Sequence, residues 1–198
     1  IQAILMASAA SKKTVRIMVP MISSALELHK VLELSTELQK RVGGKAHIGM
    51  MVETPAAALN IHSYKGLASF ISIGSNDLTQ YTLAADRENI KTAAVYNEFH
   101  PAILMLMKKA CEDARGMGME TGICGEFASR PEAAVYLASM GFDELSMSAR
   151  SIPGQKELIR ALLLKDSTAV LEQALYMDSA EKTFLLAQSF VQSLGLDT

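Results

Sequence analysis

Two carboxylates in this chain each follow an apolar segment, and their positions could bring them to one metal ion. Glu53 follows the apolar run at 47–52, and Asp77 lies three residues after the apolar run at 69–74. If both runs form neighbouring parallel strands about 4.8 Å apart, carboxylates at their ends can reach a single cation. Mg²⁺ needs only one or two protein carboxylates, because water and phosphate oxygens complete its octahedron. Glu53 and Asp77 are therefore a candidate Mg²⁺ pair.

Each of these carboxylates also has a purely structural interpretation. Asp77 can cap the helix that is expected to follow the apolar run, and Glu53 can take part in a capping arrangement before Pro55. Taken singly, each residue fits capping as well as metal binding. The sequence alone leaves both interpretations open.

An anion could be held beside these carboxylates. Gly74 ends an apolar run and permits close approach of the backbone to a ligand, and amides at the start of the following helix can hold phosphate oxygens. Arg87 comes ten residues after Asp77 on an expected loop, from which its planar guanidinium could close over an anion. A turn glycine and an ordinary surface arginine are the competing interpretations.

A thiol could supply acid or nucleophilic chemistry at a third strand end. Cys124 lies in the segment TGICGE, whose two glycines leave the thiol little steric cover. Cysteines in strands are also common as inert core residues, and Cys111 is expected to be one of these. The histidines form no motif with a nucleophile or a second metal ligand, and we interpret them as structural or solvent-facing: His29, His47, His62 and His100.

The elements that would position these residues alternate along the chain. A helical pattern follows each of the apolar segments that begin near residues 15, 47, 69, 119 and 143. Helix starts are marked by Thr54 with Pro55 and by Ser129 with Pro131. Repeated strand–helix units predict parallel strands with right-handed crossovers, and therefore an α/β fold with its active site at the carboxyl edge of the sheet. Residues 153–195 are expected to be mostly helical.

Composition limits the class of protein. The chain has 198 residues, of which 49% are hydrophobic, enough for one domain with a real core but fewer than the roughly 250 of a complete (β/α)8 barrel. Nineteen basic and twenty-one acidic residues give a net charge of -2 without a Lys/Arg cluster, so no nucleic-acid partner is expected. No apolar run reaches the ~18 residues of a membrane span and no signal segment opens the chain, which predicts a cytoplasmic protein without membrane insertion. The chain opens inside a helical pattern and is expected to be part of a longer protein.

Four motifs together resemble one family. MVETPAAA at 51–58, FISIGSNDLTQYTLAADREN at 70–89, TGICGE at 121–126 and DELSMSARSIP at 143–153 resemble the C-terminal phosphoenolpyruvate-binding barrel of enzyme I of the bacterial phosphotransferase system. The resemblance runs from the first residue to about residue 195. It implies a (β/α)8 TIM barrel of the phosphoenolpyruvate/pyruvate type, of which residues 1–198 carry strands four to eight in one domain.

The resemblance also implies residue roles. Glu53 and Asp77 match the Mg²⁺ ligands, while Asn76 and Arg87 match residues that contact the phosphoryl group of phosphoenolpyruvate. Cys124 matches the acid that protonates the enolate to give pyruvate. Three residues of the same segment are also expected to bind substrate: Gly74, Ser75 and, besides its role as metal ligand, Asp77. Ser75 stands where Thr is more usual.

One family signature is missing from this chain. A Gly-Gly followed by a Ser-His pair, which contains the phospho-accepting histidine, does not occur in the sequence. None of the four histidines is therefore expected to carry phosphate, and the phosphohistidine and carrier-binding domains are expected on other parts of the protein. The chain alone is expected to be inactive.

For the whole protein, the resemblance implies phosphoryl transfer from phosphoenolpyruvate to its own histidine and then to the histidine carrier protein HPr in sugar uptake. A homodimer formed through this domain is also implied. The alternatives are a pyruvate phosphate dikinase or phosphoenolpyruvate synthase, a Mg²⁺-dependent lyase, and a binding and dimerisation module without activity of its own. TGICGE argues against the lyase, which does not need this acid.

Overall fold

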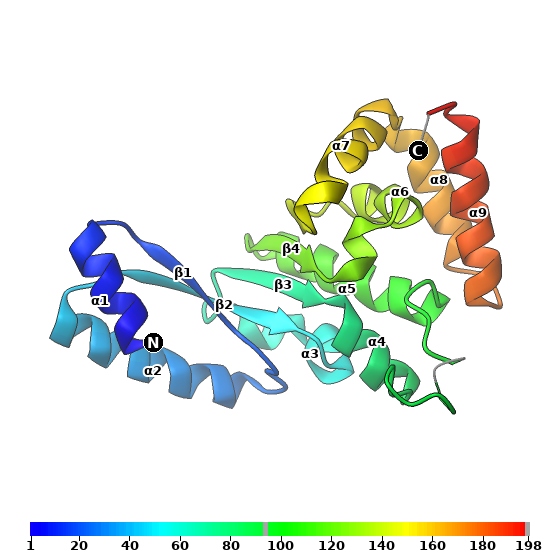
Figure 1. The fold of residues 1–198 in the computed structure, drawn as a ribbon. Coiled ribbons are helices and arrows are strands. Elements are labelled where there is room, and N and C mark those ends of the chain that lie inside the picture. The colour runs from blue at the N-terminus through cyan, green and yellow to red at the C-terminus, as the bar shows by residue number, and fades with distance from the viewer. Residues whose placement is uncertain (93–94, 197–198) are drawn as a thin grey trace.

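One parallel β-sheet forms the centre of the computed structural model, which describes residues 1–92 and 95–196. The strands pair in their order along the chain, and every pair is parallel. They are β1 (Val15–Val19), β2 (Ala46–Val52), β3 (Phe70–Gly74), β4 (Glu120–Cys124) and β5 (Glu144–Ser146). The predicted α/β fold is confirmed, and the consecutive strand order is that of a segment of a β/α barrel (Figure 1).

Helices follow every strand and dominate the C-terminal end, as predicted. Helices α1 and α2 lie at one end of the molecule, and α7, α8 and α9 lie with α6 at the other (Figure 1). No described helix is both long and apolar enough to cross a membrane. The α-helices are α1 (Gln2–Ser11), α2 (Ala25–Val42), α3 (Pro55–Leu59), α4 (Ser75–Leu83), α5 (Pro101–Gly116), α6 (Pro131–Met140), α7 (Ile152–Ala161), α8 (Leu164–Ala174) and α9 (Ala180–Ser193), and the 3-10 turns are η1 (Ile61–Tyr64), η2 (Glu126–Ser129) and η3 (Ala149–Ser151).

The two faces of the sheet have different surroundings. One face is apolar and buried in the core, where paired residues such as Met50 and Ile71 point to the same side. The other face corresponds to the inside of a barrel and lines a hollow of about 260 Å³. There the guanidinium of Arg16 lies 4.0 Å from the centre of the Phe70 ring and 2.7 Å from a carboxylate oxygen of Glu120.

Helix starts agree with the sequence in one case and differ in another. Thr54 caps α3, as predicted, because its hydroxyl accepts a hydrogen bond from the amide of Ala57 at 3.2 Å. Of the second predicted helix start, Ser129 with Pro131, only Pro131 is confirmed as the first residue of its helix, and the capping role of Ser129 is wrong. The chain first forms η2, which ends at Ser129, and α6 begins at Pro131 with Arg130 at its N-cap and no side-chain cap.

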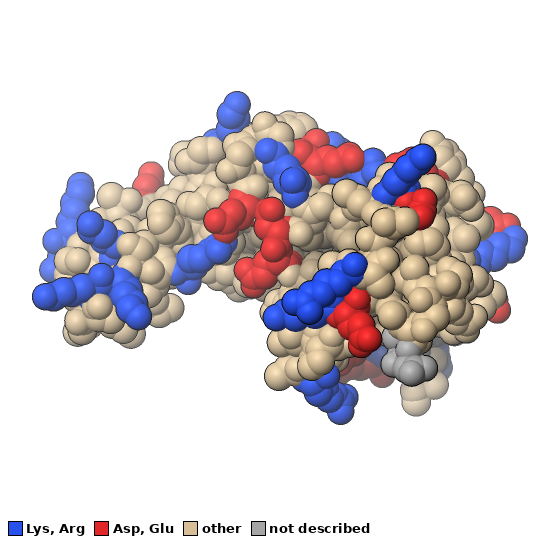
Figure 2. Space-filling model, turned by 90° about the horizontal axis from the view of Figure 1, so that it is seen from above, with Lys and Arg blue, Asp and Glu red and all other residues tan. Residues whose placement is uncertain are grey.

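Charged side chains are mixed over much of the surface. Figure 2 shows acidic and basic side chains close to one another on the viewed face, but several basic side chains gather at the end formed by α1 and α2. Lys12, Lys13 and Lys45 line one pocket there. They come together because β1 and β2 start side by side, where the amide of Val15 donates to the carbonyl of Lys45 at 3.0 Å. The sequence prediction of no basic cluster therefore fails at this end.

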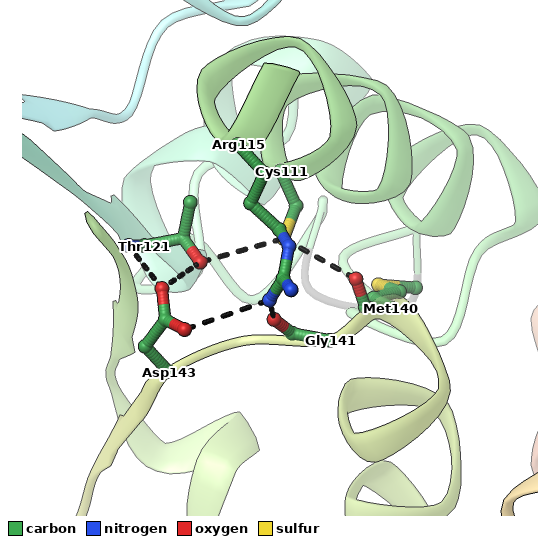
Figure 3. Close-up of polar contacts among 6 residues, drawn as sticks. All are labelled: Cys111, Arg115, Thr121, Met140, Gly141 and Asp143. Carbon is green, nitrogen blue, oxygen red and sulfur yellow. Dashed lines mark hydrogen bonds and ion pairs between the residues drawn. The ribbon is translucent and has the colours of Figure 1, made fainter. Parts of the chain in front are cut away.

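A polar network joins α5, β4 and the turn before β5 (Figure 3). One carboxylate oxygen of Asp143 accepts hydrogen bonds from the amide and the hydroxyl of Thr121, both at 2.9 Å. Its other oxygen lies 3.5 Å from the guanidinium of Arg115, which also donates to the carbonyl of Gly141. The hydrogen bonds from Thr121, and less strongly Arg115, lower the pKa of Asp143. The network holds the amino end of β4.

Asp143→Ala is expected to lower the free energy of unfolding by about 1 kcal/mol at neutral pH, since charge-assisted bonds of a half-exposed group are lost. Because the folded pKa lies below the unfolded value of roughly 3.9, this stabilisation is present above that value and disappears as pH falls through the folded pKa. Urea unfolding stepped from pH 7 downward measures it. Glu37→Ala, which removes an exposed acid from α2, is the control; equal losses in both variants would contradict the assigned role.

Cys111 belongs to the core, as predicted. Its side chain is fully buried in α5, and its sulfur lies 3.3 Å from the carbonyl oxygen of Met140 and 3.7 Å from the hydroxyl of Thr121. Burial raises the pKa of this thiol. A buried neutral thiol at this end of the sheet is remote from the carboxyl edge, so Cys111 is not part of the candidate site.

Candidate active site

The residues predicted to do chemistry meet at the carboxyl edge of the sheet. Glu53 directly follows β2, α4 begins at Ser75 directly after β3, and Cys124 ends β4. Parallel pairing sets Gly74 opposite Cys124 and the end of β2 opposite the end of β3. Three neighbouring strands thus deliver their terminal side chains to one place, which is where parallel α/β folds bind ligands.

Glu53 is a buried carboxylate held by the backbone of another loop. The side chain is 3% exposed, and one oxygen accepts a hydrogen bond from the amide of Met21 at 2.6 Å. Capping of α3 is done by Thr54, so the capping interpretation of Glu53 is wrong. A Cβ on Gly74 would lie 2.8 Å from the second carboxylate oxygen. The close approach permitted by this glycine therefore makes room for Glu53.

The second carboxylate stands near enough to repel the first. Burial raises the pKa of Glu53, the amide of Met21 lowers it, and the charge of Asp77 raises it again. Asp77 lies in the first turn of α4, whose N-cap is Gly74, and no side-chain capping hydrogen bond is present at this helix start, so the capping interpretation of Asp77 is wrong. Burial and mutual repulsion disfavour the ionised form of this carboxylate pair, and a bound divalent cation would stabilise that form.

The two carboxylates suit Mg²⁺ better than a metal ion that is coordinated by protein side chains alone. Among residues 1–92 and 95–196, no group of three or more His, Cys, Asp or Glu side chains is arranged to hold a metal ion. Mg²⁺ keeps several waters and commonly takes one or two carboxylates plus phosphate oxygens. The predicted pair, Glu53 and Asp77, therefore fits this ion by number and type.

Asn76 and Arg87, both expected from the resemblance to contact a phosphoryl group, lie in direct contact with each other. The amide oxygen of Asn76 accepts from the guanidinium of Arg87 at 2.8 Å, and its amide nitrogen donates to a carboxylate oxygen of Glu98 at 3.2 Å. This orientation follows from the neighbours, because a guanidinium only donates and a carboxylate only accepts. Asn76 thereby links the start of α4 to the loop that carries Arg87.

Glu98 is a site residue that the sequence did not indicate. It is 9% exposed, and burial raises the pKa of its carboxyl group. The Ser75 hydroxyl and the charges of Arg130 and Arg87 lower that pKa, while Glu126 raises it. This buried carboxylate lies near two arginines and ties residue 98 to the first turn of α4, where its contact with Asn76 orients the amide.

Tyr96 is the second residue that the sequence missed. Its hydroxyl donates to the backbone carbonyl of Asn76 at 3.2 Å. Burial, with a smaller contribution from Glu98, raises the pKa of Tyr96 to about 12. The hydroxyl therefore stays protonated at neutral pH and remains a donor. Two contacts from one loop, through Tyr96 and Glu98, thus fix the same residue of α4.

Cys124 reaches the edge with its thiol half-buried. The sulfur lies 3.6 Å from the carbonyl oxygen of Ile73, within range of a weak hydrogen bond. Gly125 has a φ of 122°, a value that favours glycine, and a Cβ there would collide with the hydroxyl of Ser75. The turn after β4 is therefore packed closely against the first turn of α4, which brings Cys124 and Ser75 to the same edge.

The histidines have ordinary surroundings. His29 and His47 are exposed, and His62 lies 3.9 Å from the carboxylate of Asp113 on the surface. The ring nitrogen Nδ1 of His100 accepts from an amide in the first turn of α5 at 3.2 Å and so caps that helix. These contacts agree with the structural and solvent-facing roles predicted for them.

Solved structures share the fold at low sequence identity. Protein CitE from Mycobacterium tuberculosis, solved in complex with magnesium and pyruvate, superposes with a TM-score of 0.51 at 15% identity and covers 82% of this chain and 64% of its own. Malate synthase from Haloferax volcanii gives 0.52 at 14% identity, with 77% of this chain and 48% of its own covered. These likenesses support the partial-barrel fold.

Sequence relatives are considerably nearer. A phosphoenolpyruvate-protein phosphotransferase from Haemophilus influenzae is 39% identical over all of this chain and 35% of its own length. One from Buchnera aphidicola is 42% identical over 81% of this chain and 29% of its own length. The chain thus spans about a third of these relatives. The family model of the PEP-binding domain of PEP-utilising enzymes matches residues 1–164, so the chain belongs to the PEP-utilising enzyme family.

Proposed function

We propose that this chain is the phosphoenolpyruvate- and Mg²⁺-binding part of a phosphoenolpyruvate-protein phosphotransferase. The observation that carries the proposal is the meeting of a carboxylate pair, Glu53 and Asp77, with the Asn76–Arg87 pair at one sheet edge. The names of the two relatives support this activity over the dikinase alternative. Residues 1–198 would then be the later part of one barrel domain, with the phosphohistidine and carrier-binding domains elsewhere in the protein.

In this proposal, Glu53 and Asp77 hold Mg²⁺, and Asn76 and Arg87 orient the phosphoryl group. The ion would supply positive charge for the phosphoryl and enolate oxygens. Arg87 offers a fixed fork of donors, and Asn76 has one amide hydrogen left after its bond to Glu98. Neutralising phosphoryl charge at fixed positions is the main requirement of this class of reaction.

Cys124 is the proposed acid. When the phosphoryl group leaves phosphoenolpyruvate for a histidine of the whole protein, the bridging phosphorus–oxygen bond breaks and a phosphorus–nitrogen bond forms. The remaining enolate needs one proton on its methylene carbon to become pyruvate. The thiol of Cys124 lies at the strand end beside the Asn76 turn, where it can donate that proton and recover one from water.

The same proposal extends to the partners of the whole protein. Phosphate would pass from its histidine to the histidine carrier protein HPr during sugar uptake, with release of pyruvate in the cytoplasm. A homodimer would form through this domain. The chain by itself would bind ligand and be inactive, because the phosphorylated histidine lies outside it.

Mg²⁺ binding to the chain is expected to weaken as pH falls. Protons compete with the metal for Glu53, whose folded pKa is raised by burial and by Asp77, so the competition begins at a higher pH than for an exposed glutamate. Calorimetric titration between pH 8 and pH 5 should give a plateau at the upper end and a falling affinity below it. An affinity that is the same at both ends would contradict the assignment of Glu53 as a ligand.

A further inference from the structure

Glu98 is a buried acid that adjoins the candidate active site and is no member of the carboxylate pair. The residue is 9% exposed, and within the part of the chain that the structure describes it forms no ion pair. Its hydrogen-bond partners are the hydroxyl of Ser75 and the side-chain amide of Asn76. Burying a carboxylate costs folding free energy, and such groups concentrate at functional sites. The partners of Glu98 therefore indicate what the acid is for.

The residue that follows Glu98 is anchored in the core. Phe99 is 1% exposed, and its ring packs edge-on against the ring of Phe127 with 5.0 Å between the centroids. The guanidinium of Arg130 covers the same ring at 4.6 Å from its centre. Because its neighbour is held in this way, Glu98 has a fixed place from which it can orient Asn76.

The side-chain amide of Asn76 has two possible orientations, and Glu98 favours one of them. The amide nitrogen donates to the carboxylate of Glu98 at 3.2 Å, and the amide oxygen accepts from the guanidinium of Arg87 at 2.8 Å. A half-turn of the amide would set oxygen against the carboxylate and nitrogen against the guanidinium, so that neither hydrogen bond could form. Glu98 thus helps to determine which amide atom Arg87 meets.

This orientation decides what the amide can offer to an anion. In the orientation observed, one amide hydrogen of Asn76 remains free beside the donors of Arg87. After a half-turn, the amide oxygen would take the place of this hydrogen and would repel phosphate oxygens, and Arg87 would lose its acceptor. We propose, on the basis of the function proposed above, that Glu98 is a positioning residue, which acts through Asn76 to keep this amide hydrogen and Arg87 directed at the phosphoryl group.

Glu98→Leu in the full-length protein that contains this chain tests the role. We expect kcat for phosphate transfer from phosphoenolpyruvate to fall at least about tenfold, because misplacement of an orienting group by about 1 Å can cost about 100-fold. KM should change less than about threefold, because loss of orientation weakens binding while loss of a nearby negative charge favours it. Thermal stability should be unchanged or raised, since a buried carboxylate is removed. A merely structural role would lower stability as well.

A conservative variant and a matched control complete this experiment. Glu98→Gln keeps a hydrogen-bond acceptor of the same size, and its kcat should stay within about threefold of the wild type. Glu88→Leu makes the same change at an exposed position of the loop after α4 and should leave the rate unchanged.

Each kinetic outcome has a distinct meaning. A wild type that transfers phosphate and a Glu98→Leu variant that is equally fast would overturn the positioning role and leave the proposed function standing. A Glu98→Gln variant as slow as Glu98→Leu would also overturn it, because the charge and not the accepted hydrogen bond would then matter. A wild type without transfer would overturn the proposed function, and the role of Glu98 with it.

NMR of the Asn76 side-chain amide in the chain alone tests the same contact without any reaction. A hydrogen bond to a carboxylate protects one amide proton from exchange with water, and this proton should exchange at least about tenfold faster in Glu98→Leu than in the wild type. Glu98→Gln and Glu88→Leu should remain close to the wild type. Equal exchange in the wild type and Glu98→Leu would show that Glu98 does not orient the amide and would overturn the proposal.

Discussion

Replacing Asp77 by asparagine is expected to weaken Mg²⁺ binding to this chain by at least about 100-fold. Loss of a residue that only supports a metal ligand already lowers metal affinity by about 10- to 100-fold, and Asp77 is itself a proposed ligand. The substitution keeps the shape of the side chain and removes its charge. Glu53 is then left as the only carboxylate of the pair, and it cannot hold the ion alone with comparable strength. Calorimetry with Mg²⁺ measures the change.

The same variant has a readout that needs no metal. Because the charge of Asp77 raises the pKa of Glu53, Asp77→Asn should lower that pKa, as followed by carboxyl carbon NMR of the metal-free chain. Glu88→Gln, in the exposed loop after α4, removes one acidic charge outside the pair and serves as control. An Asp77→Asn variant that behaves like this control in both measurements would contradict the carboxylate pair.

Replacing Cys124 by alanine is expected to slow pyruvate release from phosphoenolpyruvate by about 10²- to 10⁴-fold in the full-length protein that contains this chain, which is the usual contribution of a positioned acid. Mg²⁺ binding should be unchanged, because the thiol is no part of the carboxylate pair. Cys111→Ala provides the comparison, since this buried thiol lies at the other end of the sheet. Equal rates in the two alanine variants would remove Cys124 from the mechanism.

Much of the sheet could be predicted from sequence because its signals are local. Each apolar run is long enough for one strand, and Thr54 with Pro55 marks a helix start by chemistry confined to one turn. Parallel pairing then follows from the alternation of strands and helices. That topology alone brings Glu53, Asp77 and Cys124 to one edge, and the structure has them there.

The failures have a different physical origin. The capping interpretation of Glu53 rests on its position just before a helix. Its carboxylate instead accepts a hydrogen bond from the amide of Met21, which lies in the loop after β1 and 32 positions away in the sequence. No local pattern encodes such a contact. Ser129 is a good capping residue by type, but the preceding 3-10 turn ends on it and leaves the helix to start at Pro131.

Glu98 and Tyr96 were missed for a related reason. They lie in a polar loop between α4 and α5, where an acid and a tyrosine resemble ordinary exposed residues. Their burial arises only when the loop folds back and both contact Asn76, one through its side-chain amide and the other through its backbone carbonyl. Which residues lie at the strand ends of the site can thus be predicted from the sequence, whereas the contacts that the α4–α5 loop makes with the site cannot.

The most direct test is transfer of labelled phosphate from phosphoenolpyruvate to the full-length protein that contains this chain. The wild type and Glu37→Ala, an exposed change on α2, should label equally and only in the presence of Mg²⁺. Glu53→Ala and Asp77→Ala should each reduce the initial rate at least about 100-fold, in proportion to the loss of metal binding. Undiminished labelling in both variants would contradict the assignment of this sheet edge as the phosphoenolpyruvate and Mg²⁺ site.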